Sequence, residues 1–147
     1  MQMNVKSILL SAVLMVSSTS WALSQQSVTW QQLAQVQLVT KADPEGGLYS
    51  DIAFTSEILA LDGKEIEIRG YVLPLDAQGE TYALSAFPFA ACFFCGGAGK
   101  ESVMMLWLDK PGYSFTLDDL RTFRGKLKLV EGKDNPAYIL ENAAPTD

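Results

Sequence analysis

The spacing of hydrophobic and polar residues changes to a period of two after residue 63. Isoleucine, glycine or valine occupies every second position from 66 to 72, with charged or aromatic residues between them. This period is typical of a β-strand with one buried face. Gly70 within the strand predicts a bulge or a sharp bend, which would curve the sheet toward closure. Further strands are predicted at 81–86, 102–108, 126–130 and 136–141.

Helical spacing is confined to short stretches beside these strands. One short helix is predicted to begin at Thr55 and to end at Leu61. A second would begin at Thr116, because two acids would then lie in its first turn, and it would stop at Gly125. The order of these elements predicts a mainly β domain, a small five-stranded OB-like Greek-key barrel with one or two short helices. A plain open α+β sheet is the alternative architecture.

The first 24 residues have the pattern of a secretory signal peptide. Lys6 precedes an apolar run from 8 to 16, and small residues follow it, so cleavage is expected after Ala22 or after Ser24. The run is too short to cross a bilayer core of about 30 Å, and we expect no membrane span after cleavage. The protein would then be periplasmic or secreted.

The remaining chain is expected to form one domain with short extensions. Residues 25–49 form an N-terminal arm and linker, in which a short helix or an extended arm would pack through Trp30. The full division is a signal peptide at 1–24, this arm at 25–49, the OB-like domain at 50–142 and a tail at 143–147.

Composition narrows the functional classes. The 147 residues include 17 acids and 11 bases, and the net charge is −6. An acidic chain is a poor partner for nucleic acid, because phosphate binding needs clustered cations. The sequence contains no histidine, which excludes His-dependent catalytic triads and Cys/His zinc fingers.

The two cysteines, Cys92 and Cys95, carry the candidate chemistry. A turn between them would bring both sulfur atoms to one point, which suits a disulfide, a metal site or a redox-active dithiol. In an oxidising compartment, a disulfide that holds the loop is the first expectation. The loop glycines would allow the backbone to close over the site; they are Gly96, Gly97 and Gly99.

A metal ion is the second possibility for these cysteines. Two thiolates can suffice for Cu(I). Zn(II) needs further ligands, which would be Glu101, an aspartate or a second subunit.

Phenylalanines surround the two cysteines in the sequence. We expect them to be core residues beneath the loop, with an apolar pocket or a surface for a partner as the alternative. They are Phe87, Phe89, Phe93 and Phe94.

The stretch from Phe54 to Leu75 resembles the opening of a family of small exported bacterial proteins of unknown function. The shared signature is Leu-Asp-Gly-Lys, a strand, and a glycine and an aromatic residue that are followed, two residues later, by Pro-Leu. A cysteine loop and a further strand come after it. The resemblance extends over residues 50–142 and implies an OB-like β-barrel with a cysteine loop. Many relatives have a histidine and a proline run after the cysteine, where this chain has Phe94 and glycines, so Cys92 alone matches. The family's association with envelope transport and metal-regulated settings favours the metal alternative.

These observations predict an exported accessory or binding module in preference to an enzyme. Its cysteine loop would form a disulfide or bind a soft or borderline metal, and its partner would be an envelope protein. The enzymatic alternative is a thiol–disulfide oxidoreductase that uses Cys92 and Cys95. That alternative requires Cys92 at a helix N-terminus, with Lys100 available to lower the pKa of its thiol. A purely structural interaction domain is the third possibility.

Overall fold

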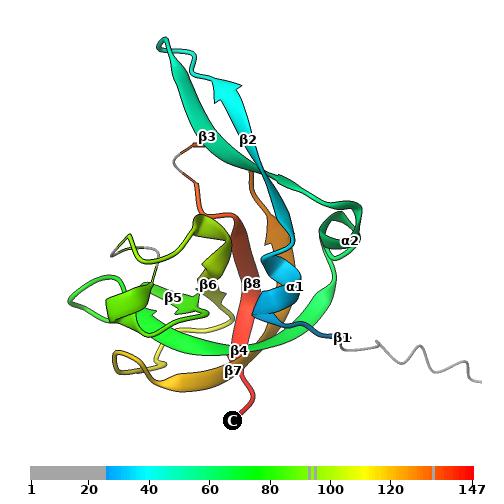
Figure 1. Ribbon diagram of the computed structural model, residues 1–147. Coiled ribbons are helices and arrows are strands. Elements are labelled where there is room, and N and C mark those ends of the chain that lie inside the picture. Colours follow the sequence, from blue (N-terminus) through cyan, green and yellow to red (C-terminus); the bar gives the residue numbers. More distant parts are fainter. Residues whose placement is uncertain (1–25, 93, 95, 134) are drawn as a thin grey trace, which may run out of the picture.

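The computed structural model describes residues 26–147 except 93, 95 and 134 (Figure 1). The expected signal peptide, Phe93 and Cys95 therefore lie outside the described residues. The elements, in chain order, are β1 (Gln26–Ser27), α1 (Trp30–Leu33), β2 (Val36–Ala42), β3 (Leu48–Phe54), α2 (Ser56–Leu59), β4 (Glu65–Pro74), β5 (Tyr82–Ser85), the 3-10 turns η1 (Phe89–Ala91) and η3 (Lys100–Ser102), β6 (Val103–Leu108), β7 (Leu120–Leu129) and β8 (Tyr138–Pro145).

Strands β4 to β8 form a closed five-stranded barrel. Around it the order is β4, β5, β6, β8 and β7, and β7 pairs again with β4. Strand β8 is parallel to β6 and antiparallel to β7, so the last strand lies between the third and the fourth. This Greek-key order confirms the predicted mainly β barrel and excludes the open α+β sheet.

Period-two alternation places one face of each strand in the barrel core. In β4, the side chains of Ile66, Ile68 and Val72 are buried in the interior, as the sequence pattern predicts. At the start of β6, Val103 and Met104 are both buried, although they point to opposite faces. Another segment of the chain therefore covers the outer face of the barrel at Val103.

Gly70 allows the close approach of three segments. A Cβ at this position would lie 2.7 Å from the carbonyl oxygen of Ser85 and 3.1 Å from the indole nitrogen of Trp30. Pairing between β4 and β7 continues through Gly70 without a register shift, so the predicted bulge is not there. Register shifts occur instead in β8, where Glu141 and Ala143 pair with the adjacent residues Trp107 and Leu108 of β6, and Asn142 between them has a φ of +52°. The pairing of β8 with β7 shifts at the same place, opposite Arg124 and Lys126.

The helix predicted from 116 to 125 is wrong. Thr116 and Asp119 form a turn, in which the Thr116 backbone N–H and hydroxyl both donate to the Asp119 carboxylate. Asp118 has a φ of +65°, which no helical residue adopts. Beyond the turn, β7 buries every second residue from Phe123 to Leu127. That strand pattern dominates because it lets β7 pair with both β4 and β8.

The segment before the barrel contributes to its core. Thr29 caps the N-terminus of α1: its side chain accepts a hydrogen bond from the Gln32 backbone N–H, and the Gln32 side chain accepts one from the Thr29 backbone N–H. The short helix expected in this segment is therefore present. Val28 and Leu33 are buried in the barrel core. The Tyr138 hydroxyl donates to the Leu33 carbonyl oxygen at 2.6 Å.

Strands β2 and β3 form a hairpin that extends away from the barrel (Figure 1). Leu38 and Leu48 on this hairpin are 82% and 77% exposed. Helix α2 follows it and confirms the short helix predicted after Thr55. Within the described part of the chain, no helix is long and apolar enough to cross a membrane.

Candidate functional site

The loop between β5 and β6 folds over the outer face of the barrel and is held there by Cys92. The Cys92 side chain is fully buried, in a small cluster with Leu73, Ala83 and Val103. These three residues come from β4, β5 and β6, and their sequence neighbours point into the barrel interior. Cys92 therefore acts as the apolar anchor of the loop.

The disulfide expected between Cys92 and Cys95 is wrong for this structure, because Cys92 is a free thiol. The physical reason is the direction of its side chain, which packs against apolar groups from three strands. Cys95 lies outside the described residues, so the structure does not place it.

Lys100 does not support a redox role for Cys92, which directly follows the last residue of η1. The ammonium of Lys100, expected to lower the pKa of the thiol, is bonded elsewhere, to the carboxylate of Asp51 and the carbonyl oxygen of Gly132. As for a metal, no group of three Cys, Asp or Glu side chains that could hold an ion occurs among the described residues.

A buried ion-pair network fixes the end of this loop. The Asp51 side chain is completely buried and accepts hydrogen bonds from Lys100 and, at 2.8 Å, from Lys41. Lys100 also donates to the Gly132 carbonyl oxygen at 3.0 Å. The network therefore joins β2, β3, η3 and the segment before β8 at one point.

Burial and the neighbouring charges have opposite effects on the pKa of Asp51. Burial alone would raise the pKa of the carboxyl, but the hydrogen bonds from Lys100 and Lys41 outweigh it and lower the pKa below its ordinary value of 3.8. The Lys41 pKa is raised by its hydrogen bond to Asp51. Both charges are therefore maintained at neutral pH.

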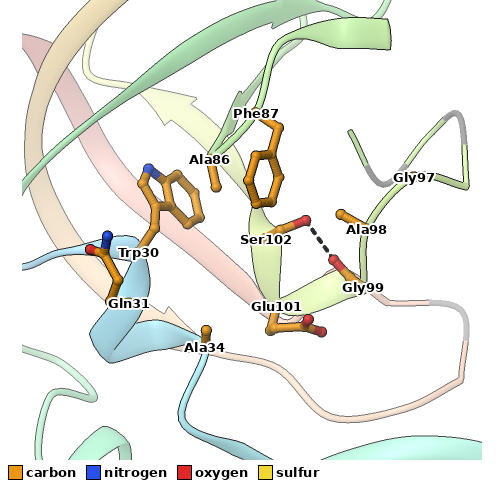
Figure 2. Close-up of a pocket in the computed structure, with 10 residues that line it drawn as sticks. All are labelled: Trp30, Gln31, Ala34, Ala86, Phe87, Gly97, Ala98, Gly99, Glu101 and Ser102. Carbon is orange, nitrogen blue, oxygen red and sulfur yellow. Dashed lines mark hydrogen bonds between the residues drawn. The ribbon is translucent and has the colours of Figure 1, made fainter. Parts of the chain in front are cut away.

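A pocket of about 500 Å³ lies between α1 and the loop (Figure 2). One wall comes from Trp30, Gln31 and Ala34, and the opposite wall from the loop at 97–99. Ala86 and Phe87, which follow β5, and the η3 residues Glu101 and Ser102 complete the lining.

Hydrogen bonds hold the pocket walls in place. The Trp30 indole N–H donates to the Arg69 carbonyl oxygen at 2.8 Å, which fixes the ring beside Gly70. On the other wall, the Ser102 hydroxyl donates to the Gly99 carbonyl oxygen at 2.6 Å (Figure 2). Gly97 packs so closely on Ala91 that a Cβ would lie 2.8 Å from the Ala91 carbonyl oxygen.

The pocket combines exposed aromatic surface with one carboxylate. Figure 2 shows the Trp30 and Phe87 rings and the Glu101 side chain around one space. Glu101 lies close enough to Tyr138 that its charge, together with the larger effect of burial, raises the pKa of the Tyr138 hydroxyl. The site therefore offers apolar contact and a negative charge.

The structure separates the residues predicted to act together. Glu101, Gly97 and Gly99 line the pocket, whereas Cys92 is buried beneath the loop. Gly96 has a positive φ of 74°, which a loop turn requires. The phenylalanines expected in the core are instead exposed, at 45% for Phe87, 44% for Phe89 and 47% for Phe94. The pocket alternative is therefore correct for Phe87.

Two important residues were not found from the sequence as site residues. Trp30 was expected only as a packing residue of the arm, and its approach to the loop depends on the barrel geometry. Asp51 had no distinguishing signal, because its two lysine partners are 10 and 49 positions away in the chain.

Comparison with known proteins supports the fold. No protein-family model matches the chain, and no curated protein matches its sequence. A crystal structure of a DUF3299 family protein from Pseudomonas aeruginosa is similar, with a TM-score of 0.50 and 18% sequence identity. The match covers 84% of this chain and 97% of the other. That neighbour is a β-barrel protein of unknown function, which agrees with the resemblance noted above for the barrel alone.

Proposed function

We propose that this chain is an exported binding module whose ligand occupies the pocket between α1 and the loop at 97–102. The ligand would be a small molecule or a side chain presented by an envelope protein. The observation that carries the proposal is the pocket itself, where Trp30 and Phe87 present aromatic surface beside the carboxylate of Glu101. Exposed aromatic groups with a few polar groups are typical of ligand sites.

The rigidity of the walls supports this proposal. Trp30 is held by its bond to Arg69, and Lys100, next to Glu101, is held by Asp51 and Gly132. A site built on fixed side chains loses little conformational entropy when a ligand binds. Export is supported by the signal-peptide pattern of residues 1–24.

The proposal changes the role of the cysteine loop. Cys92 anchors the loop that forms one wall, so its contribution to binding is structural. Binding of Cu(I) or Zn(II) by both cysteines remains a separate prediction. A titration of the reduced protein tests it, and loss of metal binding in Cys95→Ser would support it.

An NMR titration with benzyl alcohol, a small neutral aromatic probe, tests the pocket. We expect the largest amide shifts at 30–34, 86–87 and 97–102. Ala34→Trp should remove these shifts, because the indole would occupy the pocket, whereas Ala60→Trp should not. Ala60 is the matched control, since both alanines are exposed C-cap residues of four-residue helices. Shifts spread evenly over the barrel would contradict the proposal.

A further inference from the structure

We propose that the ligand of this pocket is an organic ammonium ion and that Glu101 is its counter-ion. This inference rests on the proposed function, since it names the chemical class that the same pocket would bind. It is carried by the charge of the lining, the aromatic rings and the position of the Glu101 carboxylate.

Glu101 is the charged group of the pocket. Of the described residues that line it, none is a lysine or an arginine. Within the described chain, the Glu101 carboxylate has neither a hydrogen-bond donor nor a cationic partner. The adjacent Lys100 does not neutralise it, because its ammonium is bonded to Asp51 and Gly132. A carboxylate without a cationic partner attracts a cationic ligand and repels an anionic one.

The aromatic rings favour an organic cation over a metal ion. Trp30 and Phe87 lie around the same space as Glu101 (Figure 2). The faces of aromatic rings attract ammonium groups, and tryptophan does so most strongly. A metal ion would need several oxygen or sulfur ligands, and the described lining offers a single carboxylate. An alkylammonium group can use both the charge and the apolar walls.

Gly99 determines where the carboxylate lies. A Cβ on Gly99 would overlap both carboxylate oxygens of Glu101. Gly99 itself has φ −77° and ψ 165°, an extended conformation that alanine adopts without strain. Gly99→Ala should therefore displace the flexible end of Glu101 and leave the loop backbone intact. It offers a way to move the charge without removing it.

The matched probes are benzylamine, which is protonated at pH 7, and benzyl alcohol, its neutral analogue. We expect the benzylammonium ion to bind at least about tenfold more tightly than the alcohol. NMR titrations that follow the Trp30 indole N–H resonance and the amides at 97–102 measure the affinity of each probe. The preference should decrease as salt is added, because the Glu101 carboxylate is partly exposed.

Variants separate the inference from the proposed function. Glu101→Gln should remove the preference for the amine while leaving alcohol binding, and Gly99→Ala should reduce it. Glu65→Gln, on an exposed position of β4, makes the same charge change away from the pocket and should have no effect. Equal binding of both probes, or an unchanged preference in Glu101→Gln, would overturn the ammonium inference alone. If neither probe bound, the proposed function would fail as well.

Discussion

At the scale of single residues, Cys92 acts through its packing. Its thiol fills a small apolar space on the outer face of the barrel, against Leu73, Ala83 and Val103. Buried cysteines commonly behave as small hydrophobic residues. The spacing of two cysteines in a sequence does not reveal the direction of either side chain. For this reason a disulfide was predicted where the structure has an anchor.

A pair of substitutions tests this role. Cys92→Ser should lower the free energy of unfolding by about 1–3 kcal/mol, because a hydroxyl would be buried without a hydrogen-bond partner. Cys92→Ala should cost less, since it removes a sulfur atom and buries no polar group. Urea unfolding measures both, and Ala91→Ser on the exposed preceding residue is the control. Equal losses in the serine and alanine variants would contradict the anchor role.

Glu101 was singled out from the sequence, but for a role other than the one that its position in the pocket indicates. It was predicted as an additional zinc ligand because it follows the cysteine loop, and it lines the pocket instead. Its sequence neighbourhood was informative, but the other residues that line the pocket with it were not predictable. They depend on where α1 meets the loop, and hence on the closure of the barrel.

At the scale of elements, Asp51 ties the β2–β3 hairpin to η3. Asp51→Asn should lower the free energy of unfolding by about 2–3 kcal/mol, since Lys100 would lose a charged partner in a mostly buried setting. Asp43→Asn is the matched control. Asp43 lies in the turn of the same hairpin, and its carboxylate pairs with the half-exposed Lys133. Urea unfolding should show a far smaller decrease in the free energy of unfolding for Asp43→Asn than for Asp51→Asn.

The same network predicts the response to acid. The pKa of Asp51 is lower in the folded protein than its ordinary value of 3.8. Its stabilisation is therefore present above that value and is lost as the pH falls toward the folded pKa. Between about pH 5 and pH 2, the wild-type protein should lose more stability than Asp51→Asn. Parallel curves of unfolding free energy against pH would show that Asp51 is not the group responsible.

Helix α1 packs against the barrel core and also forms a wall of the pocket. Leu33→Ala should destabilise the protein by about 2–4 kcal/mol, because Leu33 is completely buried in the core. Leu38→Ala, where the side chain is 82% exposed, should have almost no effect. Thermal or urea unfolding of the two variants measures the contrast. If both were equally stable, α1 would not be part of the folded core.

The elements differ in how much their sequences reveal. Strands β4, β5 and β6 were predicted within a few residues. Alternation indicates one buried face in β4 and β5, and an almost continuous apolar run indicates burial on both faces in β6. The cap signal at Thr116 was misleading, since the same side chain can stabilise a turn. Strands β2 and β3 were missed because buried and exposed positions do not alternate along them: Gln37 and Leu38 are adjacent and exposed, and Asp51 and Ile52 are adjacent and buried.

At the scale of the whole molecule, the site lies outside the barrel that determines the fold. The barrel was predictable from the chain order of its strands, although the first part of β7 was predicted as a helix. The pocket was not, since it is formed where α1 and the loop at 97–102 meet. The fold therefore does not by itself determine the lining of this pocket.

Residues 1–24 predict that the whole chain is exported. In a bacterial host, the full-length protein should be recovered from the periplasm with residue 23 or 25 at its N-terminus, as intact mass would measure. Leu10→Asp should retain the protein in the cytoplasm, because it places a charge in the apolar run from 8 to 16, whereas Leu10→Val should not. The processed protein should unfold at the same temperature as one produced without residues 1–24, since the described core begins with Val28. A periplasmic chain that still carried residue 1, or normal export of Leu10→Asp, would show that these residues are not a cleaved signal.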